Sequence, residues 1–287
     1  MMHPSLTLEK RIAAELASYD GQMSVYADDL KGNVVAIGPD EPFETASTIK
    51  TYILASLFDR TEKGLASLED MLTYRPEYFV DGSGVFRDLS FGTAMKVKDV
   101  ATLMIIISDN IATNMMIDYL GIDKINDCIQ ALGCKDTVLH NPIDFEKYDR
   151  LGTTTARDYA GMFVRLAKGE LISRPASEQM RAIFRKQHYN STLTRHFPQY
   201  YLDSEDTGEE ELIYVASKSG SMNACRNDGG IVHTPYGEYV VVIFNKNFSD
   251  PIYHDGHPAM EYGGRVSRML LDQYLALEGR LALQENK

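Results

Sequence analysis

The order of hydrophobic and polar positions predicts strands towards both ends of the chain and helices between them. Apolar residues recur at helical spacing through the middle of the sequence, whereas runs rich in Val, Ile and Tyr flank it. The predicted helices are residues 5–18, 51–64, 98–108, 110–121, 122–133, 154–169 and 258–284. The predicted strands are residues 23–30, 33–38, 211–220, 229–234 and 236–246, of which the first two form a hairpin.

This order predicts an α+β fold. The simplest closure is one antiparallel sheet built from both termini, with the first and last helices packed on it. We expect residues 1–46 and 190–287 to form this sheet lobe and residues 47–189 to form an inserted all-α lobe. The cleft between two such lobes is the natural place for an active site.

Composition and charge narrow the classes of protein. The chain has 287 residues, of which 44% are hydrophobic and 24% charged, so disordered, collagen-like and coiled-coil proteins are excluded. Lys and Arg number 29 against 41 Asp and Glu, and the net charge of −12 argues against a nucleic-acid partner. No apolar run approaches the roughly 20 residues that span a bilayer, so we expect no membrane span. The three cysteines, Cys128, Cys134 and Cys225, are too few for a disulfide framework.

The first 21 residues contain no basic segment followed by an apolar one, which predicts an amphipathic helix rather than a signal peptide. We therefore expect a cytoplasmic protein if the chain is full length, and an exported protein if a leader was trimmed. We also expect a monomer.

Ser47 and Lys50 form the first candidate motif, Ser-x-x-Lys, at a predicted helix start. Residues three apart share a helix face, so the amine lies beside the hydroxyl. A buried lysine with a lowered pKa could take the proton of a serine nucleophile. The alternative is a solvated Ser and Lys at the start of a helix.

Two further motifs lie at element ends. Ser108-Asp109-Asn110 separates two helical runs and either caps the second helix or supplies a hydroxyl and an amide to a site. Lys218-Ser219-Gly220 ends a strand, where a cation and a hydroxyl can hold a carboxylate and a glycine admits a close substrate backbone. The alternative for this motif is a strand end with a turn glycine.

Together the three motifs, in this order, resemble the class A β-lactamases and the penicillin-binding proteins. The segment SDNIATN, ending in Asn114, is similar to a helix of that family, and residues 151–173 are similar to the helix after its omega loop. The resemblance covers nearly the whole chain. It implies the fold predicted above, no metal or other cofactor, and a β-lactam or peptidoglycan-like small molecule as substrate.

The resemblance also implies a role for each matching residue. Ser47 would be the nucleophile, Lys50 its proton acceptor, and Ser108 the donor of a proton to the leaving nitrogen. The backbone N–H groups of Ser47 and Ser221 would form the oxyanion hole. The remaining members of the site would bind substrate: Asn110, Lys218, Ser219 and Gly220. Asp109 and Asn114 would be structural.

The chain departs from the family at the omega loop. The family's glutamate, in the local pattern E-x-x-L-N, has no match in residues 139–152, where Glu146 is the single glutamate and the candidate base for deacylation. His140 is a second candidate, because histidine titrates near neutrality. Gly152 stands where the family has the aspartate of an Arg–Asp clasp across the loop. Arg226 is the candidate for the family's carboxylate-binding arginine.

These departures leave several functions open. The first is a β-lactamase that forms an acyl-Ser47 intermediate, and the second is a penicillin-binding, D-alanyl-peptidase-like enzyme with slow deacylation. A cytoplasmic serine esterase or amidase is the third. A binding module without turnover is the fourth, and the presence of Ser47, Lys50, Ser108 and Lys218 together argues against it. The pair His254 and His257 lacks a third ligand nearby in the sequence, so we expect no metal site there.

Overall fold

The main sheet joins both ends of the chain and confirms the predicted fold class. The computed structural model describes residues 7–202 and 212–285, with side chains described up to residue 275. The sheet has six strands in the order β2-β1-β11-β10-β8, with β9 paired to β10, and every pair is antiparallel. Its strands are β1 (Gln22–Asp28), β2 (Val34–Ile37), β8 (Tyr214–Ser217), β9 (Gly220–Met222), β10 (Cys225–Thr234) and β11 (Gly237–Lys246).

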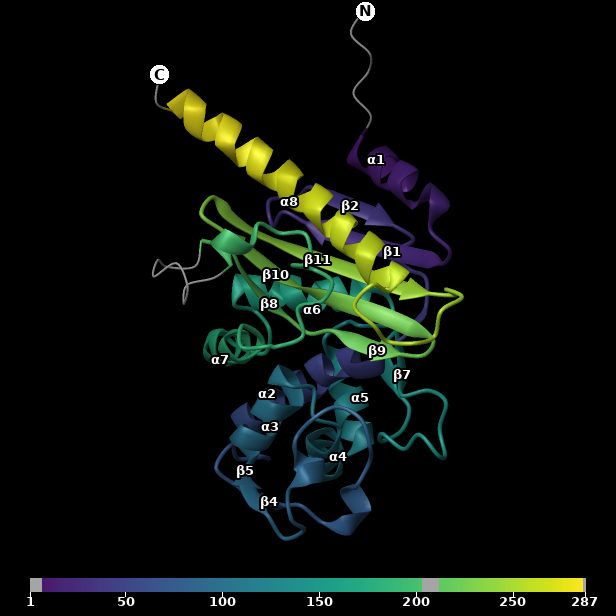
Figure 1. Cartoon of the computed structure of the whole chain (residues 1–287). Coiled ribbons are helices and arrows are strands. Elements are labelled where there is room, and N and C mark those ends of the chain that lie inside the picture. Colours follow the sequence, from purple (N-terminus) through teal and green to yellow (C-terminus); the bar gives the residue numbers. More distant parts are fainter. Residues whose placement is uncertain (1–6, 203–211, 286–287) are drawn as a thin grey trace, which may run out of the picture.

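Helices cover both faces of this sheet (Figure 1). Helix α1 (Leu8–Glu15) and helix α8 (Pro258–Glu285) lie on one face, and α6 (Ala156–Lys168) packs against the other. Strand β11 is therefore buried on both sides, and its side chains alternate between two hydrophobic cores. The core under α6 takes Val240, Val242 and Phe244. The core under α1 and α8 takes Tyr239, Val241 and Ile243.

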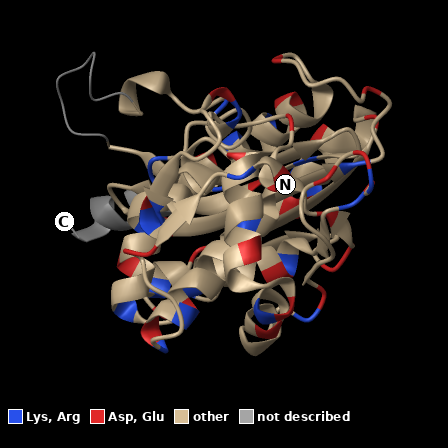
Figure 2. Cartoon of the chain, turned by 90° about the horizontal axis from the view of Figure 1, so that it is seen from below, with Lys and Arg blue, Asp and Glu red and all other residues tan. Residues whose placement is uncertain are grey.

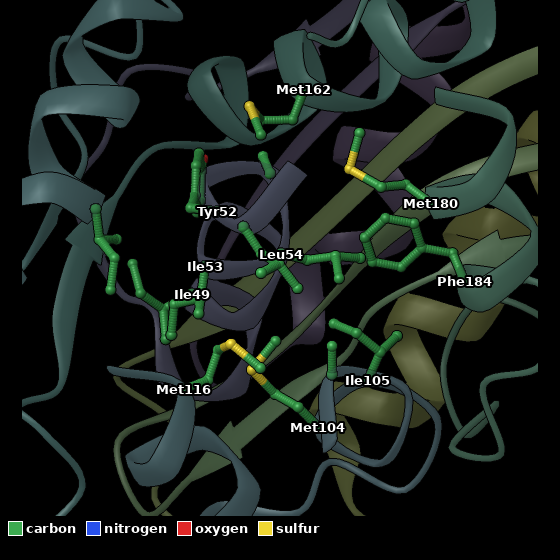
Figure 3. Close-up of a cluster of buried hydrophobic side chains, with 14 of the residues drawn as sticks. Ile49, Tyr52, Ile53, Leu54, Met104, Ile105, Met116, Met162, Met180 and Phe184 are labelled. Atoms are coloured by element: carbon green, nitrogen blue, oxygen red, sulfur yellow. The ribbon is translucent and has the colours of Figure 1, made fainter. Parts of the chain in front are cut away.

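The remaining helices form a bundle below the sheet in Figure 1. They are α2 (Lys50–Glu62), α3 (Val97–Ile106), α4 (Asn110–Leu120), α5 (Ile122–Ala131) and α7 (Arg174–Phe184). Helix α2 runs through the middle of the bundle, and all of its residues from Lys50 to Phe58 are buried. Figure 3 shows Ile53 and Leu54 of this helix surrounded by Met104, Met116 and Phe184 from three other helices. A helix buried on all sides is held in a fixed position, which matters because Lys50 begins it.

Several elements follow the prediction closely, and others do not. The two helices around Gly121 lie where their periodicity placed them, because a left-handed glycine with φ of 86° separates them. Helix α7 was not predicted, although Ser173 caps it and Pro175 lies in its first turn. The short strand pairs were also missed, since two or three residues carry no periodicity. They are β4 (Met71–Thr73) with β5 (Ala94–Lys96), and β3 (Phe43–Glu44) and β6 (Val138–Leu139) on either side of β7 (Gly152–Thr154).

The strands after residue 211 differ from the prediction in their limits. The predicted strand 211–220, whose first residue lies outside the described part, is assigned as β8 and β9. The ladder nevertheless stays in register between them, because the Lys218 N–H donates to Gly229 O at 3.0 Å. The predicted strand 229–234 starts earlier, at Cys225, since this polar stretch pairs with the apolar strand β11. The predicted helix 5–18 is α1 followed by a 3₁₀ turn, and its residues 5 and 6 lie outside the described part.

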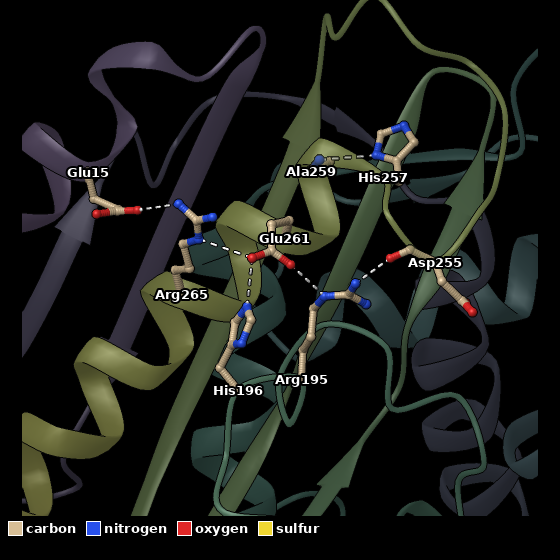
Figure 4. Close-up of polar contacts among 8 residues, drawn as sticks. All are labelled: Glu15, Arg195, His196, Asp255, His257, Ala259, Glu261 and Arg265. Carbon is tan, nitrogen blue, oxygen red and sulfur yellow. Dashed lines mark hydrogen bonds and ion pairs between the residues drawn. The ribbon is translucent and has the colours of Figure 1, made fainter.

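An ion-pair network attaches α8 to the rest of the sheet layer (Figure 4). The Glu261 carboxylate accepts from Arg195 at 2.9 Å, from His196 at 3.1 Å and from Arg265 at 3.1 Å. Arg265 also reaches Glu15 of α1 at 3.2 Å. The hydrogen bond from Arg195 is the main reason that the pKa of Glu261 lies below its usual value.

The surface seen from below carries charges of both signs, and all three cysteines are buried. Figure 2 shows acidic and basic residues interspersed on the helices and loops seen from below. Cys128, Cys134 and Cys225 are buried free thiols, and burial raises the pKa of each to about 12. Among the described helices, none has both the length and the apolar character to cross a membrane.

The bundle core allows a direct test of the packing. Phe184 is fully buried against Phe163, with ring centroids 5.4 Å apart. Replacing it with alanine should lower the free energy of unfolding by about 3–5 kcal/mol, through lost burial and a cavity. Phe145→Ala, at a side chain that is 52% exposed, should change it by no more than about 0.5 kcal/mol. Urea unfolding of both variants measures the difference, and equal effects would contradict this packing.

Candidate active site

Ser47 lies in a 3₁₀ turn, Ala46–Ile49, that connects β3 to the buried helix α2. Ala46, directly before it, has a φ of 45°, a left-handed conformation that is strained for a residue with a side chain. The Thr48 hydroxyl fastens the turn by donating to Thr45 O at 2.6 Å. Ser47 is half-buried and borders a cavity, whereas Lys50, one turn further on, is fully buried.

The Lys50 amine is held by three acceptors. Its Nζ donates to the backbone oxygen of Ser108 at 2.7 Å, to Ser108 Oγ at 3.0 Å and to Asn110 Oδ1 at 2.9 Å. Burial lowers the pKa of Lys50 well below its usual value, and the neighbouring Lys218 amine lowers it further. The Asp109 carboxylate opposes this shift. Because its pKa is lowered, Lys50 loses its proton more readily than an ordinary lysine, and the neutral amine can then accept a proton.

Ser108 lies in the turn between α3 and α4, in a left-handed conformation with a φ of 54°. Its hydroxyl oxygen accepts from Lys50 and also from Lys218 Nζ, at 3.1 Å. A hydroxyl oxygen has two lone pairs, so with both occupied its own hydrogen is directed to a third group. Ser108 borders the same cavity as Ser47, so that third group can be a bound molecule.

Lys218 is fully buried, and burial lowers its pKa to about 7. Asp228 on β10, also buried, partly opposes this shift, and its own pKa is raised to about 7 by burial. Besides Ser108, the Lys218 amine donates to Ser219 O at 2.6 Å. Tyr159 of α6 donates from its hydroxyl to Lys218 O at 2.7 Å, which fixes the backbone at this point.

Asp109 and Asn110 attach a loop to the start of α4. Asp109 caps this helix through the Ala112 N–H, and its second carboxylate oxygen accepts from the backbone of Val85 and Phe86 at 2.7 and 2.9 Å. Asn110 Nδ2 donates to Asp81 O at 3.1 Å. Asn110 is 5% exposed and does not border the cavity, and Lys50 and Asp81 engage both polar atoms of its side chain.

The cavity has a volume of about 360 Å³ and is lined by residues that lie far apart in the sequence, from Ser47 to Tyr253. Six predicted site residues line it: Ser47, Ser108, Ser219, Gly220, Ser221 and Arg226. Lys50 and Lys218 lie behind its wall. Six other lining residues carried no signal in the sequence, because their places depend on long-range packing: Ser83, Tyr189, Ser191, Met222, Asn223 and Tyr253.

Arg226 borders the cavity and is held by backbone and aromatic contacts. Its guanidinium donates to Cys225 O and Pro251 O, both at 2.9 Å, and it also bonds to Met222 O. It lies 5.3 Å from the ring centroid of Phe248 and 5.5 Å from that of Tyr253. A fixed cation at this place favours an anionic group in the cavity.

The two candidate bases of the loop 140–151, Glu146 and His140, lie outside this cavity. Glu146 is exposed and borders a separate groove with Asn114, Phe79 and Asp118. His140 Nε2 bonds to Thr153 Oγ1 at 2.9 Å and is also outside the cavity. Among the described residues that line the cavity, none is Asp or Glu.

Asn114 anchors this same loop to α4. Its side-chain amide donates to Ile143 O at 2.9 Å and accepts from Ile143 N–H at 2.8 Å.

His254 and His257 lie in the loop between β11 and α8. His257 Nε2 bonds to Asp250 O and His254 Nε2 bonds to the Asp250 carboxylate, both at 2.8 Å. Both histidines thus have partners within their own loop.

Comparisons with known proteins first define the fold and then the family. A β-lactamase from Sphaerobacter thermophilus and PBP-A superpose with a TM-score of 0.80, at 28% and 29% identity, over 95% of this chain and 97% of each. The fold is therefore of the β-lactamase/transpeptidase type. Residues 7–274 match the Beta-lactamase enzyme family, and this chain belongs to that family.

Curated relatives are similar over most of the chain. The β-lactamase FAR-1 of Nocardia farcinica is 24% identical over an alignment of 260 positions that covers 85% of this chain and 74% of the relative. The β-lactamase 1 of Bacillus cereus is 25% identical over an alignment of 271 positions that covers 88% of this chain and 81% of the relative.

The contact between β9 and the Ser47 turn gives a prediction about Gly220. A Cβ at this position would lie 2.7 Å from Thr48 N, 2.8 Å from Ser47 N and 2.8 Å from Thr45 O. Since these are backbone atoms, Gly220→Ala should displace the turn and lower the free energy of unfolding by about 1–3 kcal/mol. The control is Gly161→Ala in α6, where a Cβ would meet nothing within 4 Å beyond its own stretch of helix, and a gain of about 0.5–1 kcal/mol is expected. Thermal unfolding compares the two, and a neutral Gly220→Ala would contradict the close approach.

Proposed function

We propose that this protein is a serine acyl hydrolase that opens the amide of a β-lactam through an acyl-Ser47 intermediate. The observation that carries this proposal is the Ser108 hydroxyl, which lies between two buried amines in the wall of the cavity that Ser47 also borders. Membership of the β-lactamase family supports it.

In the proposed acylation, protons pass from Ser47 to Lys50, from Lys50 to Ser108 and from Ser108 to the leaving nitrogen of the substrate. Ser47 Oγ attacks the amide carbonyl while its proton passes to the neutral amine of Lys50. The C–O bond forms and the C–N bond breaks. Ser108 gives its hydroxyl proton to the leaving nitrogen and is reprotonated by Lys50, whose Nζ lies 3.0 Å away. The developing oxyanion would be held by the backbone N–H groups of Ser47 and Ser221, a contribution of a few kcal/mol in comparable sites.

The carboxylate of the substrate is proposed to bind beside Ser219 and Arg226, which both border the cavity. Lys218, Ser219 and Arg226 would provide the positive charge and the hydroxyl for it. Asn110 would bind the substrate's amide side chain, in exchange for its present bond to Asp81 O. Gly220 does not supply the room for the substrate backbone that the sequence had suggested, because the backbone of the Ser47 turn fills the space beside it.

A second candidate is a penicillin-binding, D-alanyl-peptidase-like enzyme whose acyl-enzyme is long-lived. The position of Glu146 favours it, because this carboxylate is exposed and borders a different groove from Ser47. A structural neighbour supports it as well: a mutant of PBP-A forms an acyl-enzyme complex with penicillin-G. Both candidates share the acylation step and differ in the fate of acyl-Ser47.

The nucleophile is tested by substitution. Ser47→Ala should abolish covalent labelling by benzylpenicillin, since no other residue would carry the acyl group. Intact-protein mass spectrometry measures the mass gain, with Ser191→Ala as the control at a second serine that borders the cavity. Labelling that survives Ser47→Ala would disprove the mechanism.

The fate of the acyl group is tested by following the same mass gain over time. Persistence for many minutes would support the second candidate, since no carboxylate among the described lining residues would activate water. Glu146→Gln should leave this lifetime unchanged. Rapid loss of the adduct in the parent, abolished by Glu146→Gln, would instead identify a β-lactamase that uses this glutamate.

The two lysines predict how acylation depends on pH. Lys50 must be neutral to accept a proton, so the rate rises with pH as its lowered pKa is passed. Lys218 must be protonated to bind an anion, so the rate falls again above its pKa of about 7. Lys218→Arg keeps its charge and should remove the fall on the alkaline side. Stopped-flow acylation by benzylpenicillin between pH 5 and 9 measures this, and an unchanged alkaline limb in Lys218→Arg would refute the assignment.

A further inference from the structure

One carboxylate oxygen connects the nucleophile turn to the loop 140–151. Glu44 Oε1 accepts three backbone N–H bonds, from Ala46 at 3.1 Å, from Leu151 at 3.0 Å and from Gly152 at 3.2 Å. The first donor directly precedes Ser47, and the other two close the loop. A backbone bond from Thr45 N–H to Gly152 O, at 3.1 Å, runs beside them.

The backbone of Glu44 is attached to a third segment. Its carbonyl oxygen accepts from Asn227 Nδ2 on β10 at 2.7 Å. Asn227 pairs with Gly220 of β9, the strand that also carries Ser221. The bond from Asn227 therefore connects Glu44 to this strand as well. Glu44 therefore contacts the nucleophile turn, the loop end and the sheet edge of the cavity.

The three donors need this acceptor. Ala46, Leu151 and Gly152 are all buried, so a lost acceptor would leave their N–H groups without water to replace it. Bonds from N–H groups to an ionised carboxylate are about twice as strong as bonds to a neutral acceptor. The bond to Ala46 also holds a residue whose φ of 45° is unfavourable on its own.

Gly152 explains why this task falls to Glu44. A Cβ at position 152 would lie 2.7 Å from Val138 O and 2.9 Å from Thr45 Oγ1. No aspartate fits there, so a clasp from that side of the loop is excluded. The carboxylate that bonds to the loop end comes instead from Glu44 on β3.

We propose that Glu44 is a positioning residue, whose carboxylate fixes strained Ala46 against the closed end of the loop 140–151 and thereby sets the attack position of Ser47. The proposal rests on the proposed function, because it assumes that Ser47 is acylated. Glu44 does not border the cavity, so it acts on the reaction through Ser47 and not by touching substrate.

The test compares Glu44→Gln and Glu44→Ala with Glu41→Gln. Glu41 is a matched control, since its carboxylate is 50% exposed and lies 3.7 Å from Lys246 Nζ at the start of the same segment. Stopped-flow mixing with benzylpenicillin gives the limiting rate of acylation and the half-saturating concentration separately. All measurements are made at a temperature where near-UV circular dichroism shows every variant to be folded.

We expect the limiting rate to fall about a hundredfold in Glu44→Ala, as for a nucleophile displaced by about 1 Å. It should fall about tenfold in Glu44→Gln, whose amide oxygen still accepts but carries no charge. The half-saturating concentration should stay within about twofold of the parent value, because other residues are proposed to bind the carboxylate of the substrate. Glu41→Gln should match the parent. A folded Glu44→Ala that is acylated at the parent rate overturns the proposal.

A second measurement does not depend on the reaction. Amide hydrogen exchange should show lost protection at Ala46, Leu151 and Gly152 in Glu44→Ala, with the strands β10 and β11 unchanged. If the parent protein is never acylated, the proposed function fails, and exchange alone decides whether Glu44 holds the two segments together. Unchanged protection at all three amides refutes the contact itself.

Discussion

The burial of two amines around one hydroxyl is the constraint on which the rest of this site depends. A buried ammonium group loses hydration worth several kcal/mol unless polar partners replace the water. Lys50 finds three such partners in Ser108 and Asn110, and Lys218 finds Ser108, Ser219 O and the charge of Asp228. These partners come together only where the start of α2, the turn before α4 and the strand β10 meet. Burial itself lowers the pKa of both lysines, which is the property their proposed chemistry requires.

The backbone that presents these groups is strained at two places, and a carboxylate lies beside each. Ser108 and Ala46 both adopt left-handed conformations that residues with side chains rarely occupy. Asp109 fixes the first by accepting from the backbone of Ala112, Val85 and Phe86. Glu44 fixes the second by accepting from Ala46, Leu151 and Gly152. In each case charge-assisted bonds to buried N–H groups offset a local conformational cost.

The larger frame keeps these strained turns in register. Strand β11 is buried on both faces, and α6 connects its lower face to the helical bundle through Tyr159. The Tyr159 ring contacts Tyr52 of α2 and Phe244 of β11, with centroids 6.0 and 5.3 Å away. Its hydroxyl meets the backbone of Lys218. One aromatic side chain thus touches the nucleophile's helix, the sheet and the segment between β8 and β9 that carries the second amine.

The sequence by itself determined the fold class, the order of the long elements apart from helix α7, and the three motifs that meet at the cavity. These features are local, because periodicity and a spacing of three residues act within one helix or strand. Only the tertiary structure decided that Asn110 is bonded to Lys50, that Glu146 lies outside the cavity, that Glu44 bonds to the end of the loop, and that Asp228 acts on the Lys218 amine. Glu44 and Leu151 are separated by 107 positions, and such a pair shows no pattern along the chain. Long-range contacts of this kind are fixed by how the helices and the sheet pack, so a single sequence does not reveal them.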